Sequence, residues 1–270
     1  MGLPPLFGMQ EDVTVHLKNL QTQILRFESL PSTNLEAARQ AINGAAEGLC
    51  VVANEQTSGR GRLERQWVSP KDAGLYFSIV LRPQFEQGAW PLLTLMAAVA
   101  VSDALRGACM LETDIKWPND ILVGEKKVCG ILAESIETPL GRAVVVGIGI
   151  NLTSQSLPEE LQLEATSVEI ATGRRFEFEV VLNALVEALV RLYETLKQSA
   201  GPETIIREWS ARSSYGEGKL VRVIESNTTI NGITRGLERD GALRVETYDG
   251  EIKVVRAGDV TSVRPDGNPS

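Results

Sequence analysis

The sequence has very little histidine: His16 is the single one among 270 residues, and it lies in an N-terminal segment without a clear pattern. A zinc site built on histidines needs at least two of them, and a Ser-His-Asp triad needs one held firmly in the fold. The single histidine therefore nearly removes both kinds of site. Any catalysis must rely on lysine, arginine, carboxylates and backbone amides.

Cysteine is also scarce. The three cysteines, Cys50, Cys109 and Cys129, are odd in number and show no Cys-x-x-Cys spacing. Cys50 and Cys129 lie in apolar runs, which is typical of reduced core residues rather than of disulfides or metal ligands. This usage predicts a cytoplasmic protein.

Basic residues are outnumbered, with 27 Lys and Arg against 35 Asp and Glu and a formal net charge of −8. Because nucleic-acid binders usually carry a basic face, this balance predicts no nucleic-acid partner. We find no run of about twenty apolar residues, so we expect no membrane span and no membrane partner. The N-terminal residues lack the charged and apolar sections of a signal peptide.

What is present is a loop with unusual chemistry, residues 55–67, which reads EQTSGRGRLERQW. Its two glycines permit backbone conformations that side chains forbid, and its three arginines carry fixed positive charge. The planar fork of arginine suits the oxygens of phosphates and carboxylates. The loop alone fits two interpretations, a lid over an anion and a solvated charged surface loop.

Three further motifs follow in order: KWPND at 116–120, KVCGILAE at 127–134 and GIGIN at 147–151. Together with the loop they resemble the biotin protein ligases, or biotin–[acetyl-CoA-carboxylase] ligases. That family's pattern is Gly-Arg-Gly-Arg-x-Gly-Arg-x-Trp, then Lys-Trp-Pro-Asn-Asp, then Lys-x-x-Gly-Ile-Leu. The resemblance covers roughly residues 24–265, with one departure: the family's third loop glycine is Glu64 here.

The resemblance implies an α+β fold in two parts. Residues 1–216 would form a biotin- and ATP-binding catalytic domain, with a mixed central β-sheet flanked by helices, as in class II synthetase-like and biotin–lipoate ligase domains. Residues 217–270 would form a small C-terminal SH3-like β-barrel. Residues 1–23 are too few for the winged helix-turn-helix that some family members carry, so we expect the short form without a DNA-binding domain.

Periodicity and turn residues predict the elements independently. The expected strands span 24–30, 49–53, 74–81, 113–116 and 143–152, with a hairpin over 121–134 turning near Gly124. The expected helices span 35–42, 90–107, 178–198 and 202–209, and a polar loop covers 153–163. Thr33 and Glu36 form a capping-box pattern. Beyond Lys219 we expect short strands with turns at Asn231-Gly232, Asp240-Gly241 and Asp249-Gly250.

The chemistry implied by the resemblance is activation of biotin by ATP to biotinyl-5'-AMP, followed by transfer to a carrier lysine. Lys116 and Arg62 are the predicted catalytic residues. Lys116 would bridge the substrate carboxylate and the α-phosphate and stabilise charge on the phosphoryl oxygens. Arg62 would hold the same phosphate from the loop. From its position alone, Lys116 could equally be a surface lysine at a strand end.

The resemblance also predicts the residues that bind each substrate. The predicted biotin-binding residues are Ser32, Thr33, Asn34, Gln56, Arg60, Gly61, Arg62, Lys116, Gly130 and Gly149. The predicted ATP-binding residues are Arg60, Arg62, Arg65, Trp67, Lys116, Asn119, Lys127 and Asn151. Trp67 could stack on adenine or anchor the loop, and Lys127 could meet a phosphate or solvent.

The implied substrates are ATP and biotin, with Mg²⁺ carried by the triphosphate; the metal ligands are unassigned, although Asp120 and Glu134 are nearby carboxylates. The implied partner is the biotin carboxyl carrier protein domain of acetyl-CoA carboxylase. The sequence leaves open whether the protein forms a homodimer. Two alternatives also remain at this stage, a lipoate–protein ligase and a non-catalytic ligand-binding regulator on the same scaffold.

Overall fold

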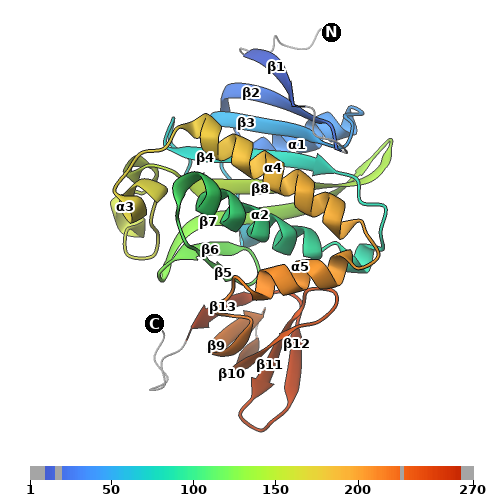
Figure 1. The fold of residues 1–270 in the computed structure, drawn as a ribbon, viewed down its shortest axis with the longest axis vertical. Helices are drawn as coiled ribbons and strands as arrows, with labels where there is room; N and C mark the ends of the chain where they lie inside the picture. The colour runs from blue at the N-terminus through green and yellow to red at the C-terminus, as the bar shows by residue number, and fades with distance from the viewer. Residues whose placement is uncertain (1–9, 16–19, 226–227, 263–270) are drawn as a thin grey trace.

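The computed structural model describes residues 10–15, 20–225 and 228–262, which form a large mixed sheet with helices and a small second sheet (Figure 1). The large sheet has the order β1-β2-β3-β4-β8-β7-β6-β5. Its strands are β1 (Gln10–Val15), β2 (Thr22–Leu30), β3 (Leu49–Gln56), β4 (Gly74–Leu81), β5 (Asp114–Lys116), β6 (Asp120–Val123), β7 (Lys126–Thr138) and β8 (Gly141–Asn151). Only β2 and β3 pair in parallel, and the other pairs are antiparallel, so the predicted mixed sheet is confirmed.

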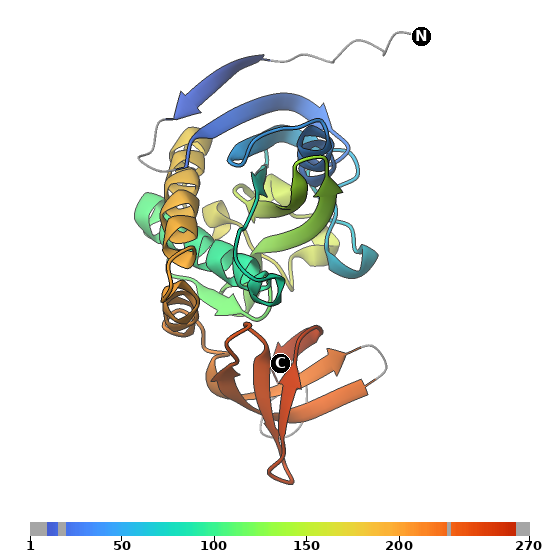
Figure 2. The ribbon, with the colours of Figure 1, turned by 90° about the vertical axis from the view of Figure 1, so that its right-hand side faces the viewer.

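Helices cover both faces of the large sheet. On one face lie α2 (Leu92–Cys109), α4 (Phe178–Leu196) and α5 (Gly201–Ser210), and on the other lies α1 (Thr33–Ile42), which connects the parallel strands (Figures 1 and 2). Parallel neighbours require such a crossover, because a tight turn cannot join them. The α1 face also carries the loop that follows β3, so α1 and this loop share one side of the sheet.

Helix α2 is apolar over most of its surface, with Asp103 and Arg106 near its C-terminal end. With the 3₁₀ turn η2 (Gln87–Ala89) it forms the one helix, within the described ranges, that is long and apolar enough to cross a membrane. The segment is not an unbroken apolar run, because Asp103 and Arg106 interrupt it. The most apolar part of the helix is 72% buried inside the protein, between the sheet and α4, which identifies it as a core helix.

The second sheet has five antiparallel strands in the order β12-β11-β10-β9-β13, as predicted for an SH3-like barrel. They are β9 (Glu217–Glu225), β10 (Thr228–Leu237), β11 (Leu243–Thr247), β12 (Ile252–Val255) and β13 (Asp259–Ser262). The turns at Asp240-Gly241 and Asp249-Gly250 are confirmed, with both glycines at φ +84°. The turn predicted at Asn231-Gly232 is wrong: both residues lie inside β10, because pairing with strands on both sides overrides the local turn preference.

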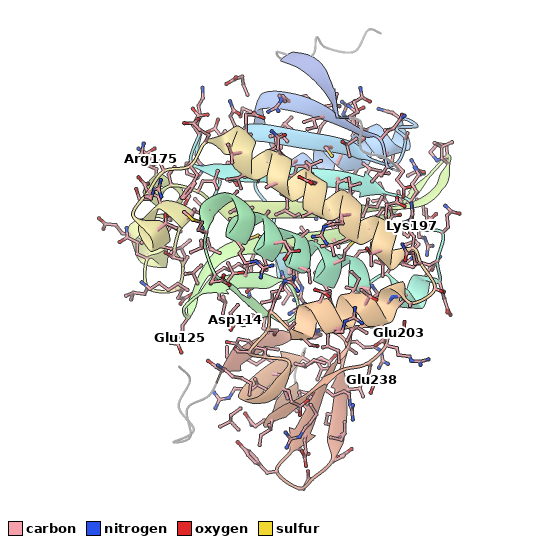
Figure 3. The ribbon with its side chains drawn as sticks, viewed as in Figure 1. Asp114, Glu125, Arg175, Lys197, Glu203 and Glu238 are labelled. Carbon is pink, nitrogen blue, oxygen red and sulfur yellow. The ribbon has the colours of Figure 1, made fainter. Side chains whose placement is uncertain are left out.

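The two sheets share a continuous hydrophobic core. Trp117, at the end of β5, is buried, and its Nε1 donates a hydrogen bond of 3.0 Å to the carbonyl of Gly241 in the second sheet. Asp114 accepts hydrogen bonds from the backbone and hydroxyl of Ser214 just before β9, and Figure 3 shows Asp114 close to this junction. The second sheet is thus fixed against the large one on the β5 side.

Two local predictions fail. The capping box does not form, because Ser32 is the N-cap, Thr33 lies inside the helix and the carboxylate of Glu36 pairs with Arg39. The region predicted as a polar loop contains the 3₁₀ turns η3 (Ser154–Ser156) and η4 (Glu159–Leu161), and the short helix α3 (Val168–Thr172) follows it. Helix α3 has a hydrogen-bonded serine N-cap, Ser167, and a glycine C-cap, Gly173; at five residues it is too short for periodicity to reveal it.

Candidate active site

The arginine-rich loop folds back on itself. We call residues 58–67 the lid loop. The amide of Trp67 donates to the carbonyl of Gly59 at 2.9 Å, and the amide of Gly61 donates to the carbonyl of Arg65 at 2.7 Å. The 3₁₀ turn η1 (Arg62–Glu64) forms its tip. Glu64 has φ +60°, a conformation that favours glycine, and this explains why the family pattern has glycine at this position.

The lid loop covers a cavity of about 580 Å³. The floor is strand β7, which contributes Leu132 and Glu134. The remaining lining residues all belong to the lid loop: Ser58, Gly59, Arg60, Gly61, Arg62, Leu63, Glu64, Arg65 and Gln66. A volume of this size is typical of small-molecule and cofactor sites.

Each lid arginine has a different partner. Arg60 forms a two-pronged ion pair with Glu134 on β7, with Nη2 2.8 Å from Oε1 and Nη1 3.3 Å from Oε2. Arg62 Nη1 donates to Asn119 Oδ1 at 3.1 Å, which brings the GRGR and KWPND motifs together. Arg62 Nη1 also donates to the carbonyl of Gly258 in the connection between β12 and β13, and Arg65 pairs with Asp259, the first residue of β13.

The predicted biotin residues at the start of α1 are tied to the end of β3. Gln56 Oε1 accepts hydrogen bonds from the backbone amide of Thr33 at 2.8 Å and from its hydroxyl at 3.1 Å. Gln56 Nε2 in turn donates to Ser69 Oγ at 2.8 Å. The side chain of Gln56 therefore takes the place of a helix cap, since the Ser32 hydroxyl caps no backbone amide.

Asn34 continues this network into the sheet. Its Nδ2 donates to Glu134 Oε2 at 2.9 Å and to the carbonyl of Leu132 at 3.2 Å, and its Oδ1 accepts from Ser78 Oγ at 2.7 Å. Sequence reasoning missed Ser78, which also lies 2.8 Å from Thr33 Oγ1. The available signal was a serine in the middle of a completely buried, otherwise largely apolar strand. Asn34 fits against β8 because Gly147 has no side chain: a Cβ there would lie 1.9 Å from Asn34 Oδ1.

Two of the predicted biotin glycines make room for Trp67. A Cβ on Gly149 would lie 2.4 Å from Trp67 Nε1, and one on Gly130, its cross-strand neighbour, would lie 3.0 Å from the same ring. The ammonium of Lys127 stands 5.3 Å from the centre of the Trp67 ring. Trp67 Nε1 is buried and has no acceptor among the residues that the structure describes. A buried donor without an acceptor suits a ligand that brings one.

Lys116 ends β5, directly across from Asp120 on β6. Within the described part of the chain its ammonium makes no hydrogen bond or ion pair, whereas the neighbouring Lys127 pairs with Asp120 at 2.6 Å. Burial lowers the pKa of Lys116; the Asp120 carboxylate opposes this shift and the Lys127 charge adds to it. Lys116 is thus a half-buried amine without a partner, next to the cis peptide bond that joins Trp117 and Pro118.

The remaining predicted ATP-binding residues either line a second, smaller cavity or lie outside both cavities. A cavity of about 390 Å³ is lined by Arg62, Asn119 and the Asp240–Ala242 turn of the second sheet, among others. Arg62 and Leu132 line both cavities. Asn151 is buried at the end of β8 and donates to the carbonyl of Thr166 at 3.1 Å, outside both cavities.

Comparison with known proteins agrees with the motifs. Residues 26–151 match the Biotin/lipoate A/B protein ligase family, and residues 218–261 match the Biotin protein ligase C terminal domain. The chain is 36% identical to the Bifunctional ligase/repressor BirA of Bacillus spizizenii, over 94% of this chain and 76% of that protein. It is 38% identical to the Biotin–[acetyl-CoA-carboxylase] ligase of Paracoccus denitrificans, over 78% of this chain and 89% of that protein.

A solved structure shows the same fold. It is the biotin protein ligase from Aquifex aeolicus in complex with biotin and ATP, with a TM-score of 0.78 and 30% identity. The similarity covers 89% of this chain and 98% of that one. The mixed sheet with its lid, the antiparallel second sheet and these relatives define the class: the chain belongs to the biotin protein ligase family.

Proposed function

We propose that this protein activates biotin with ATP to biotinyl-5'-AMP and pyrophosphate, and then transfers biotin to one lysine of a biotin carboxyl carrier protein. The observation that carries the proposal is the 580 Å³ cavity roofed by the lid arginines and floored by β7. Two relatives of this protein are named biotin–[acetyl-CoA-carboxylase] ligases. The similar solved structure from Aquifex aeolicus is a complex with biotin and ATP.

The first step needs positive charge around the α-phosphate. Arg62 and Lys116 supply it, and the Lys116 ammonium makes no direct ion pair within the described ranges. Such a charge, held in advance where phosphoryl charge develops, stabilises the transition state over the ground state. Arg65 would meet the other phosphates once these displace Asp259, and Arg60 would order the lid loop through Glu134.

The second requirement is protection of the adenylate, a mixed anhydride that reacts with water and with any amine. The lid loop lies along one side of the cavity, and the Trp67 ring packs against Gly130 and Gly149. A closed loop excludes water until the carrier lysine arrives. The carrier, which we propose to be a domain of acetyl-CoA carboxylase, would therefore have to approach the lid side of the sheet.

Magnesium would enter with the triphosphate. The described residues include no cluster of three or more His, Cys, Asp or Glu side chains able to hold a metal. Asp120 and Glu134 are each paired with a cation, Lys127 and Arg60 respectively. Because Mg²⁺ keeps several waters and takes few protein ligands, we propose that the phosphates are its principal ligands. Chelation by EDTA should then stop pyrophosphate release and leave biotin binding intact.

We further propose a cytoplasmic location, which the three buried free cysteines support. Fractionation tests it. We also propose that the protein exchanges between a monomer and a homodimer. Light scattering, which gives the molar mass in solution, tests this. The edge strands of the large sheet are β1 and β5. On β5, the amide of Ile115 already donates to the carbonyl of Arg212. We therefore propose that two copies would pair through β1.

The deciding experiment measures pyrophosphate release with biotin, with lipoate and with neither. Release that depends on biotin, together with labelling of a carrier domain, is the expected result. Release that depends on lipoate would identify a lipoate–protein ligase. Tight biotin binding without any release would identify a non-catalytic regulator.

A further inference from the structure

We propose that Glu134 is a positioning residue that couples the lid loop to the polar end of the biotin site. The inference rests on the proposed function, because it assigns a role within the same site. Glu134 stands on the cavity side of β7 and lines the 580 Å³ cavity.

One carboxylate group makes both connections. Glu134 Oε2 accepts from Asn34 Nδ2 at 2.9 Å and lies 3.3 Å from Arg60 Nη1, while Oε1 accepts from Arg60 Nη2 at 2.8 Å. The Glu134 side chain is 30% exposed and the Arg60 side chain 43% exposed, so water partly screens their ion pair. A hydrogen bond with one charged member is stronger than a neutral one.

The Asn34 amide is fixed by these contacts in one orientation. Its oxygen faces the Ser78 hydroxyl and its nitrogen faces Glu134 and the carbonyl of Leu132. If Glu134 released the nitrogen, the amide could rotate and the pattern of donors and acceptors offered to a ureido ring would change. Glu134 therefore determines how Asn34 is presented.

The other end of the lid loop belongs to the same network. Ser69 lies two residues after the loop; its hydroxyl accepts from Gln56 Nε2 and donates to the carbonyl of Trp67. Gln56 Oε1 binds Thr33, whose hydroxyl touches Ser78, which binds Asn34. A continuous hydrogen-bonded chain thus starts at one end of the lid loop, crosses the start of α1 and returns through Glu134 to Arg60 at the other end.

Two substitutions separate the two contacts. Glu134→Gln keeps a carbonyl oxygen for Asn34 but removes the charge that holds Arg60. Glu134→Ala removes both. Glu137→Gln is the matched control, because Glu137 lies on the same strand and forms an ion pair with Arg142 away from the cavity.

Three measurements are made on the full-length protein: biotin affinity by calorimetry without ATP, trypsin cleavage at the lid arginines with and without saturating biotin, and the dissociation rate of biotinyl-AMP. For Glu134→Gln we expect biotin affinity within about threefold of wild type, loss of the biotin-dependent protection, and adenylate release faster by about tenfold, the size expected for one charge-assisted contact. Glu134→Ala should also weaken biotin binding by about tenfold, and Glu137→Gln should behave as wild type.

The outcomes separate the two proposals. If wild type neither binds biotin nor releases pyrophosphate, the proposed function fails. If wild type is active and Glu134→Gln keeps both the lid protection and the adenylate lifetime, the role of Glu134 is overturned. Equal loss of biotin affinity in Glu134→Gln and Glu134→Ala, with lid protection at saturation unchanged, would show a purely structural residue and also overturn it.

Discussion

At the scale of single residues, Lys116 carries the clearest consequence. Lys116→Ala should leave the fold intact, since the ammonium makes no ion pair or hydrogen bond to the described residues. Loss of a charge held in advance at a developing phosphoryl charge costs about 3–4 kcal/mol. Biotin-dependent pyrophosphate release should therefore fall by about 10²–10³-fold, with a smaller change in biotin affinity. A near wild-type rate of adenylate formation would remove Lys116 from the mechanism.

The lowered pKa of Lys116 gives a second test, in which activity and stability move in opposite directions. Only the ammonium form can stabilise the phosphoryl charge, so the rate should fall as pH rises through the lowered pKa. Between that pKa and the higher value of the unfolded chain, the unfolded state binds more protons, so this group's contribution to stability rises with pH. An arginine at this position stays charged, so Lys116→Arg should shift the alkaline limb of the pH–rate profile to higher pH. An unchanged limb would contradict the assignment.

Glu64 is the residue where the chain departs from its family. Its φ of +60° costs a non-glycine residue about 1–2 kcal/mol, whereas a glycine enlarges the entropy of the unfolded chain by about 0.4–1 kcal/mol. These effects oppose each other, so Glu64→Gly should change the free energy of unfolding by less than about 2 kcal/mol and should preserve adenylation. Thermal melts and the KM for ATP measure this. Complete loss of adenylation would reveal a specific role of the carboxylate.

At the scale of elements, loss of a lid contact should affect the release of biotinyl-AMP more than its formation. Arg62 connects the lid to Asn119 and to the second sheet, so Arg62→Gly removes both contacts and favours the open loop. The variant should still form some biotinyl-AMP but release it much faster. The dissociation rate of the adenylate and the biotin found on a bystander protein in the same tube measure this. Normal retention without bystander labelling would show that the loop does not act as a lid.

The elements themselves differ in how far the sequence predicts them. Helices α2 and α4 and strands β4 and β8 carry long apolar or periodic runs, and each lies within a few residues of its prediction. Failures occur where tertiary contacts outweigh short signals. Asn231-Gly232 is a turn signal inside a strand paired on both sides, and the capping box at the start of α1 loses to Gln56, distant by 23 residues.

The site shows the same limit. The motifs name Arg62 and Asn119, yet only the fold shows that they touch. Ser78 and the double contact of Glu134 depend on β4, β7 and α1 packing together, with sequence separations of 44 to 100 residues. No local pattern encodes such contacts. The roles predicted for the individual biotin and ATP residues stay predictions until ligands are bound.

At the scale of the whole molecule, the second sheet stabilises the large sheet and supplies contacts to the lid loop. A protein ending at Tyr215 should still fold, because most residues of the shared core belong to the large sheet and its helices. It should be less stable by a few kcal/mol, since the buried Trp117 indole loses its acceptor, Gly241, which alone costs about 1–3 kcal/mol. It should also turn over poorly without the Gly258 and Asp259 contacts to the lid. Full activity and an unchanged melting temperature would make the second sheet dispensable.

The contacts of Arg62 and Arg65 with Gly258 and Asp259 span 196 and 194 residues of sequence, far more than the 23 between Thr33 and Gln56. Contacts between distant parts of a chain close large loops, and the entropy of closure delays them. The α1 side of the cavity should thus form early in refolding, and the fastening of the lid should come last. A chain refolding from denaturant would bind biotin before it could retain biotinyl-AMP. During that interval it would release the adenylate into solution.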